Sequence, residues 1–157
     1  ARGKMKWSVE DNVPDMTGKT VLITGSNSGL GYHCADQLLS RGATIVLACR
    51  NADKMGAAAV SLQAAHGTPA SRILQLQLDV SDLVSVRAAP AALLELGVSA
   101  LYGLVLNAGV NGRDVVTFTT DGLERVFVTN ILGHWLLTGL LLPLMRDVEG
   151  SRVVAVS

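Results

Sequence analysis

The chain has 157 residues, a formal net charge of zero and 49% hydrophobic residues. This length suits a single domain, and the lack of a basic stripe or a long charge run argues against nucleic-acid binding. The 16 glycines, the plentiful alanine and the scarce aromatic residues favour a parallel sheet covered by closely packed helices.

Residues 1–16 are predicted to form an irregular N-terminal extension, and residues 17–157 a single domain. The basic stretch from Ala1 to Lys6 would fit the remnant of an organelle-targeting presequence. Cys34 and Cys49 lack the spacing of metal ligands, so we expect buried thiols in a reducing compartment and no metal site, with a disulfide left open. The predicted location is therefore intracellular, either cytoplasmic or organellar.

A glycine-rich turn lies between an apolar strand, Thr20–Thr24, and a helix expected from Tyr32 to Ser40. Glycines let a backbone approach a pyrophosphate closely, and a helix N-terminus offers free N–H groups. The turn is therefore predicted to bind a nucleotide phosphate, and the alternative is an ordinary strand-to-helix loop. The predicted phosphate-binding residues are Gly25, Ser26, Asn27, Ser28, Gly29, Leu30 and Gly31.

The second predicted strand, Thr44–Ala48, leads into Arg50, Asn51 and Lys54. In a nucleotide-binding unit, an acid just after this strand favours NAD, whereas a base favours the 2′-phosphate of NADP. The sequence therefore predicts NADP. NAD is less favoured but stays open, because Ser28 stands where a second basic residue would strengthen the assignment of NADP. The alternative for Arg50 is a solvated loop arginine.

A helix is predicted from Asp53 to His66, and a third strand from Arg72 to Leu78 ends in Asp79-Val80. An acid at the carboxyl edge of a strand can accept a hydrogen bond from an adenine amino group, so Asp79 and Val80 are predicted to contact a cofactor. Ser81 is expected to cap the next helix, which runs to Leu96 with Asp82 in its first turn.

A fourth strand, Leu101–Leu106, ends in a second set of small residues, predicted to leave room for a ribose or a flat ring: Asn107, Ala108 and Gly109. Asn107 is also expected to tie neighbouring strands together by hydrogen bonds. After a loop, a long helix is predicted from Thr120 or Asp121 to Met145.

The most apolar part of this helix, Ile131–Met145, contains His134 and Pro143, so we expect a buried helix and no membrane span. Asn130 lies among apolar residues of the same helix and needs hydrogen-bond partners if it is buried. Its predicted role is either structural, by bonding a neighbouring carbonyl, or functional, by holding a water or a catalytic side chain.

With a fifth strand over Ser151–Ser157, strands and helices alternate along the chain. This alternation predicts an α/β fold, a Rossmann-like open parallel sheet of about five strands with helices on both faces. The glycine turn, Arg50, Asp79 and Asn107–Gly109 would all lie at the carboxyl ends of strands, where cofactors bind in such sheets.

Taken together, these motifs resemble the short-chain dehydrogenase/reductase family over about residues 17–157. The segment from Val128 to Trp135 is similar to the helix that carries the family's catalytic asparagine, here Asn130. Leu47–Asn51 and Asn27–Gly31 look most like the branch of retinol dehydrogenases and protochlorophyllide reductases. The resemblance implies an NAD(P)-dependent oxidoreductase that uses NADPH on a lipophilic small-molecule substrate, and a homo-oligomer at full length.

The chain departs from the family pattern at its catalytic pair, because neither Tyr32 nor Tyr102 is followed by a lysine four residues later. Ser157 aligns with the residue before the family's catalytic serine. Two hypotheses follow: these residues are the N-terminal part of a complete reductase, or they form a catalytically inactive structural or nucleotide-sensing subunit of a larger assembly. A P-loop protein is excluded because no Gly-Lys-Ser/Thr follows the turn.

Overall fold

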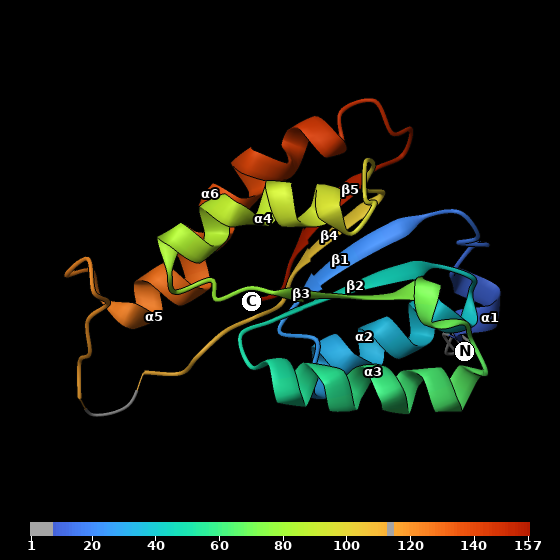
Figure 1. The fold of residues 1–157 in the computed structure, drawn as a ribbon, viewed down its shortest axis with the longest axis horizontal. Helices are drawn as coiled ribbons and strands as arrows, with labels where there is room; N and C mark the ends of the chain where they lie inside the picture. The colour runs from blue at the N-terminus through green and yellow to red at the C-terminus, as the bar shows by residue number, and fades with distance from the viewer. Residues whose placement is uncertain (1–7, 113–114) are drawn as a thin grey trace, which may run out of the picture.

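A computed structural model describes residues 8–112 and 115–157, and five parallel strands form its single sheet. The strands are β1 (Thr20–Thr24), β2 (Thr44–Cys49), β3 (Ile73–Gln77), β4 (Gly103–Leu106) and β5 (Arg152–Ala155). Their spatial order is β3-β2-β1-β4-β5, with helices on both faces (Figure 1). The predicted Rossmann-like architecture is therefore confirmed.

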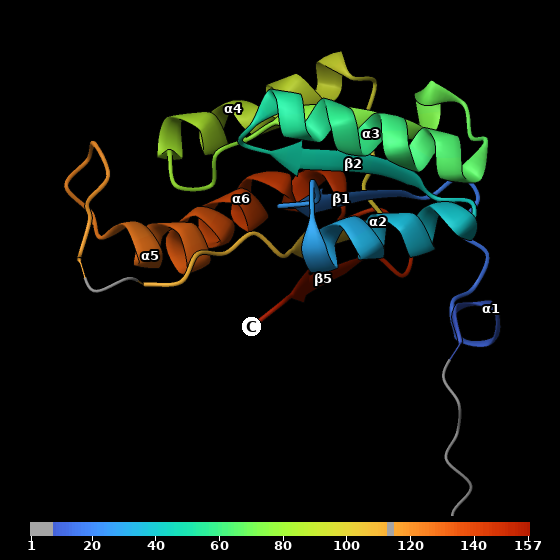
Figure 2. The same cartoon turned by 90° about the horizontal axis from the view of Figure 1, so that it is seen from below.

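Two pairs of helices enclose the sheet (Figures 1 and 2). The first pair is α2 (Gly29–Ser40) and α3 (Ala52–His66), and the second is α4 (Leu83–Glu95) and α6 (Gly133–Leu141). Successive residues of β1 point to opposite faces: Leu22 belongs to the apolar core under α4 and α6, and Ile23 to the core under α2 and α3. Both side chains are fully buried, as expected for a central parallel strand.

The chain changes direction across the sheet at β1. After β1 it builds β2 and β3 on one side, and it then returns to place β4 and β5 on the other side. The switch point therefore lies between the carboxyl ends of β1 and β4, where open α/β sheets bind their ligands.

The N-terminal segment is more regular than predicted. Residues 9–12 form the one-turn helix α1 (Val9–Asn12), which Ser8 caps by accepting a hydrogen bond from the Asp11 N–H. Val9 and Met16 are buried, so this part of the segment packs on the domain. Residues 1–7, including the whole basic stretch, lie outside the described residues, and the predicted domain division stays a prediction.

The long helix begins later than predicted. It consists of α5 (Arg125–Phe127), the π-helical turn η2 (Val128–Leu132), α6 and the 3₁₀ turn η3 (Leu142–Leu144). Thr120 and Asp121 do not cap it, because Gly122 adopts a left-handed φ of 74° and Phe118 forms a bridge to Glu124. The Glu124 carboxylate instead accepts hydrogen bonds from the N–H groups of Val126 and Phe127 in α5.

The same helical segment is only partly buried, contrary to the prediction of a buried helix. Leu137 and Leu141 are fully buried, but Trp135 is 73% exposed. Arg125–Leu144 is long and apolar enough to cross a membrane by length and composition, with a mean hydropathy of 1.5. Because a core helix of a soluble protein passes the same test and this helix packs against α4, that finding is weak support for a span.

Candidate functional site

A cavity of about 380 Å³ opens at the carboxyl ends of β1, β2 and β4. Its volume lies at the lower end of the range for small-molecule sites, about 300–1,000 Å³. Many of the predicted cofactor residues line it together: Gly25, Asn27, Ser28, Arg50, Asn51, Lys54, Val80, Asn107, Ala108 and Gly109. Four separate loops of the chain therefore meet at one place in the fold.

The remaining predicted cofactor residues lie near this cavity without lining it. Ser26 is buried, with its Oγ 3.4 Å from Cys49 Sγ, and Gly31 is buried inside α2. The Leu30 side chain is 72% exposed. Gly29 and Asp79 do not line the cavity, but each is next to a lining residue in the chain.

The glycine turn is shaped by close backbone contact on one side and open space on the other. Gly25 has a φ of 65°, and a Cβ there would lie 2.9 Å from the Cα of Ala108. Gly29 has a φ of 58°, with no other atom within 4 Å of the place where a Cβ would stand. Side chains would therefore obstruct the turn at Gly25 and fill the open approach at Gly29.

Helix α2 begins at Gly29, three residues earlier than predicted, so its N-terminus lies within the glycine turn. Ser28 occupies the N-cap position but makes no side-chain hydrogen bond to the helix among the described residues. The first N–H groups of this 12-residue helix are thus available, with the positive end of the helix dipole, to an anionic group in the cavity.

Thr24 and Asn107 join the glycine turn to the end of β4. The Thr24 hydroxyl oxygen accepts hydrogen bonds from the N–H groups of Asn107 and Ala108, both at 2.9 Å. The Asn107 side-chain amide donates to the carbonyls of Thr24 at 3.0 Å and Gly25 at 3.3 Å. Asn107 therefore ties the two strands together, as the sequence predicted.

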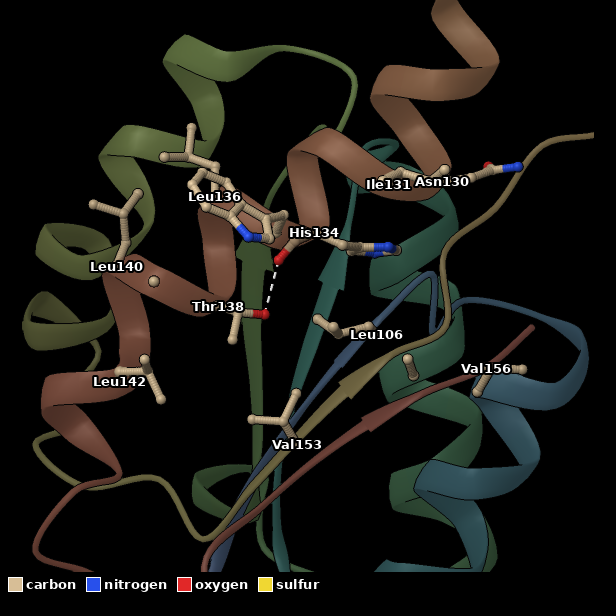
Figure 3. A pocket seen from close by; sticks show the side chains of 13 residues that line it. Leu106, Asn130, Ile131, His134, Leu136, Thr138, Leu140, Leu142, Val153 and Val156 are labelled. Atoms are coloured by element: carbon tan, nitrogen blue, oxygen red, sulfur yellow. Dashed lines mark hydrogen bonds between the residues drawn. The ribbon is translucent and has the colours of Figure 1, made fainter.

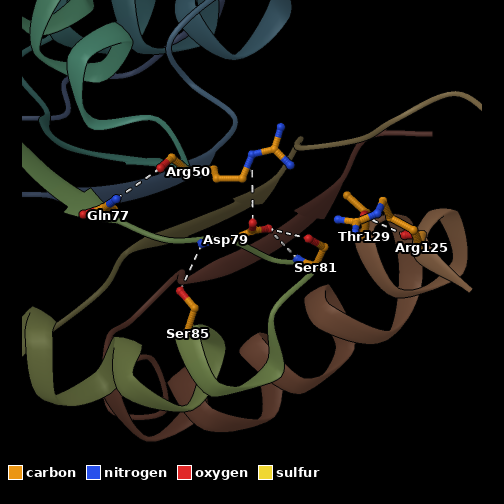
Figure 4. Close-up of polar contacts among 7 residues, drawn as sticks. All are labelled: Arg50, Gln77, Asp79, Ser81, Ser85, Arg125 and Thr129. Atoms are coloured by element: carbon orange, nitrogen blue, oxygen red, sulfur yellow. Dashed lines mark hydrogen bonds and ion pairs between the residues drawn. The ribbon is translucent and has the colours of Figure 1, made fainter. Parts of the chain in front are cut away.

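Arg50 and Asp79 face each other at one edge of the cavity (Figure 4). Arg50 Nε lies 3.9 Å from Asp79 Oδ2, and the arginine side chain is 66% exposed. Asp79 Oδ1 accepts hydrogen bonds from the Ser81 N–H and hydroxyl, at 2.9 and 2.7 Å. An ion pair this long and exposed contributes little stability, so the guanidinium can turn toward an anion at little cost.

Ser81 and Asn51 have different local roles from those predicted. Ser81 does not cap α4, because its hydroxyl is held by Asp79, and the cap is Asp82, whose carboxylate accepts from the Val84 N–H. Asn51 lines the cavity and also caps α3, accepting from the Lys54 N–H at 2.8 Å.

Asn130 is exposed, not buried as predicted, and it lies in the π-helical turn η2. Its side-chain amide donates to the Val110 carbonyl, and its Oδ1 accepts from the Val110 N–H, both at 2.9 Å. These two hydrogen bonds to the backbone of Val110 match the structural alternative for Asn130. Its catalytic role stays a prediction, although π-helical turns often occur at functional sites.

The cavity also contains residues that sequence reasoning missed. They are Ala48, Cys49, Leu78, Val110 and Thr129. Most of them directly adjoin predicted residues in the chain, so extending each motif by one position would have found them. Both cysteines are free thiols, and burial raises the pKa of Cys34.

His134 was passed over as part of an apolar helix. It is buried, and its Nε2 lies 3.0 Å from the Thr24 hydroxyl oxygen. Burial lowers its pKa, and a hydrogen bond to the Asn130 backbone partly opposes that shift. Only the tertiary packing of α6 on β1 brings this imidazole to the cavity wall.

A larger groove of about 710 Å³ lies between α6 and β5 (Figure 3). Its described lining residues are almost all apolar and include no acidic or basic side chain except His134. A phosphate-bearing ligand needs cations or N–H donors, and the smaller cavity offers both. The smaller cavity is therefore the candidate nucleotide site.

The model of the short chain dehydrogenase family matches residues 19–157. The chain belongs to the short-chain dehydrogenase family. A short-chain dehydrogenase/reductase of Armillaria gallica is 39% identical over 98% of this chain and 50% of its own length. Retinol dehydrogenase 14 of Mus musculus is 44% identical over 90% of this chain and 44% of its own length. The chain thus spans about half the length of these relatives.

Solved structures agree with this membership. L-sorbose reductase from Gluconobacter frateurii, in complex with NADPH and L-sorbose, has a TM-score of 0.76 and 28% identity, covering 89% of this chain and 52% of that one. A Mycobacterium paratuberculosis protein of uncharacterized function has a TM-score of 0.74 and 38% identity, covering 88% of this chain and 47% of that one. Within the short-chain dehydrogenases, the predicted resemblance to retinol dehydrogenases is confirmed.

The residues around the cavity fit a dinucleotide of the kind this family binds. The glycine turn and the start of α2 would hold a pyrophosphate, Arg50 and Lys54 would face the adenosine ribose, and Asn107–Gly109 would border the ribose or ring beyond it. When bound, a nicotinamide cofactor would supply or accept the hydride, and the chain's own contribution would be to bind and orient it.

Proposed function

We propose that this chain contributes the nucleotide site of an oxidoreductase that transfers hydride between NADP(H) and a lipophilic small-molecule alcohol or carbonyl. The observation that carries the choice of NADP is the charge of the cavity. Its described lining includes Arg50 and Lys54, and the Asp79 carboxylate lies outside the lining, 3.9 Å from Arg50 Nε. A free 2′-hydroxyl is usually bound by an acid at this place, whereas a 2′-phosphate is bound by bases.

The names of related proteins support the same proposal. Several solved neighbours were determined with NADP or NADPH. The curated relatives include retinol dehydrogenases, whose named substrate is a lipophilic alcohol. The proposal also includes an intracellular location and a homo-oligomer, to be checked by fractionation and by light scattering.

Cofactor choice is tested by replacing Arg50. Because a charge-assisted hydrogen bond is lost and a repulsive charge is added, Arg50→Asp should weaken NADPH binding by about 10- to 100-fold while NADH binding changes little. Titration calorimetry with both nucleotides measures the ratio. Arg87→Asp, on the exposed side of α4, is the matched control for charge reversal. An unchanged NADPH-to-NADH ratio in Arg50→Asp would refute the assignment.

The alternative is a catalytically inactive subunit that senses a nucleotide. It predicts nucleotide binding without turnover. NADPH oxidation by the whole native protein, followed with a panel of lipophilic aldehydes and ketones, separates the two functions. Turnover with any of them supports the oxidoreductase, and tight binding with no turnover across the panel supports the subunit.

A further inference from the structure

His134 lines the larger groove and contacts Thr24, the residue just before the glycine turn of the nucleotide cavity. It lies in the first turn of α6 with only 5% of its surface exposed (Figure 3). Its Nε2 is 3.0 Å from the hydroxyl oxygen of Thr24, which is fully buried. This contact joins the helix to the residue that anchors the turn after β4.

The hydrogen bonds of Thr24 determine which proton His134 carries. A hydroxyl has one proton to donate and two lone pairs to accept with. The N–H groups of Asn107 and Ala108 occupy both lone pairs. The proton then points to the nearer acceptor, which is His134 Nε2 at 3.0 Å and not the Val105 carbonyl at 3.4 Å.

The imidazole must therefore accept at Nε2 and carry its proton on Nδ1. The Asn130 backbone lies close enough to raise the pKa of this imidazole, so its carbonyl is the acceptor available to the Nδ1–H. A proton on Nε2 would instead bring a third donor to a hydroxyl whose lone pairs are already filled. The neutral Nδ1–H tautomer is the form that leaves every described hydrogen bond of the Thr24 hydroxyl in place.

We propose that His134 is a positioning residue of the nucleotide cavity: as a neutral imidazole it orients the Thr24 hydroxyl, which holds the N–H groups of Asn107 and Ala108 in place. Asn130, four residues earlier in the same helical segment, holds Val110 by two further hydrogen bonds. The helical segment thus fastens both ends of the cavity wall formed by residues 107–110. The importance of this wall for binding rests on the proposed nucleotide site.

Protonation of His134 would remove the acceptor of the Thr24 hydroxyl proton. Nε2 would become a donor facing a filled hydroxyl, and one of the two turn N–H groups would lose its acceptor. The ring bonds to Thr24 of β1, and the other described residues that line the groove with His134, mostly from α6, β4 and β5, include no acid to stabilise an imidazolium. The cavity wall should therefore loosen in acid.

The tautomer is tested first, on the ligand-free wild-type protein. Nitrogen-15 chemical shifts of the His134 ring distinguish the Nδ1–H form, the Nε2–H form and the imidazolium. We expect the Nδ1–H form at neutral pH, and we expect the amides of Asn107 and Ala108 to lose hydrogen-exchange protection as the ring protonates. An Nε2–H tautomer, or protection unaffected by protonation, would overturn the proposal whatever the protein binds.

The consequence for binding is tested by titration with NADP⁺, which is stable in acid. His134→Leu removes the acceptor and should weaken binding at neutral pH by about five- to tenfold, the effect of one lost buried hydrogen bond. His134→Gln keeps an acceptor amide oxygen near the Nε2 position but does not titrate. It should therefore bind more tightly than His134→Leu and lose affinity less steeply in acid than the wild type.

Two controls separate positioning from general damage. His66→Gln replaces a histidine that pairs with Asp36 at the far end of α3, and it should leave the pH profile of NADP⁺ binding as in the wild type. Thermal melts check that each variant folds. If the wild type binds no NADP⁺, the proposed function fails while the tautomer experiment still decides on His134. Equal pH profiles for the wild type and His134→Gln would contradict the positioning role.

Discussion

Gly31 lies where helix α2 comes closest to the turn after β4. A Cβ at this position would stand 2.5 Å from Asn107 Nδ2 and 2.6 Å from the Gly25 carbonyl oxygen. Both atoms belong to the hydrogen bonds that join β1 to β4 at the cavity. The small size of this residue is therefore needed for the packing beneath the site, although the residue does not line the cavity.

Gly31→Ala should lower the free energy of unfolding by about 1–3 kcal/mol, because overpacking against fixed backbone forces a shift. Urea unfolding measures the change, and NADP⁺ titration should show weaker binding. Gly139→Ala is the matched control: Gly139 is also helical but is exposed, with no other atom within 4 Å of the new Cβ. Helix propensity predicts that it gains up to about 1 kcal/mol. Equal effects of the two substitutions would contradict the close approach at Gly31.

At the level of the element, the start of α4 shows how neighbouring side chains divide their roles. Ser81 and Asp82 are both good N-cap residues by type. Asp79 holds the hydroxyl and the N–H of Ser81, which leaves Asp82 to accept from the Val84 N–H at 2.9 Å. The choice of cap is therefore made by Asp79, near the start of the loop between β3 and α4.

Asp82→Ala should lower the free energy of unfolding by about 1 kcal/mol, the usual effect of losing a cap. Asp82→Asn retains an acceptor and is expected to recover most of the loss. Denaturant unfolding gives both values. Because Asp82 does not line the cavity, NADP⁺ affinity should stay near the wild-type value in both variants. A loss in Asp82→Asn as large as in Asp82→Ala would show that the side chain does not act as a cap.

Hydrophobic pattern and turn chemistry predicted which elements form, because each strand and helix is set by local spacing and by burial of an apolar face. The glycine turn, Arg50 and Asn107 could be brought together from sequence because carboxyl ends of parallel strands share one edge. The start of the long helix could not be predicted from the sequence, because it depends on Gly122 and on the bridge from Phe118 to Glu124. The π-helical turn and the contact of His134 with Thr24 also arise from tertiary packing, which no local pattern encodes.

At the scale of the whole molecule, the strand order explains why these contacts gather at one place. β1 is central, and the two halves of the sheet leave it in opposite directions. The glycine turn after β1 and the small-residue turn after β4 therefore lie side by side, and Thr24 bonds to both. Because α6 packs over the same strands, a change in His134 can alter both the geometry of the cavity and the stability of the domain.

That connection makes the global stability depend on pH in a defined direction. Burial lowers the pKa of His134 from its ordinary value of 6.5, and the Asn130 hydrogen bond opposes the shift in part. As pH falls through 6.5, the unfolded chain takes up a proton more readily than the folded protein. The stabilising contribution of the neutral ring is therefore complete above about pH 6.5, and it is lost as pH falls through the lowered folded pKa.

Unfolding free energies of the wild type and His134→Gln, measured from about pH 7.5 to about pH 5, test this prediction. The variant has no titrating group at this position. The difference in unfolding free energy between the two proteins should therefore be constant at high pH, and the wild type should lose stability relative to the variant as pH falls. Asp15 does not interfere, because hydrogen bonds from Thr17 lower the pKa of its carboxyl below 3.8. Parallel curves across the whole range would mean that the folded protein accepts a proton on His134 as readily as the unfolded chain does. The assignment of a neutral imidazole to the buried His134 would then be wrong.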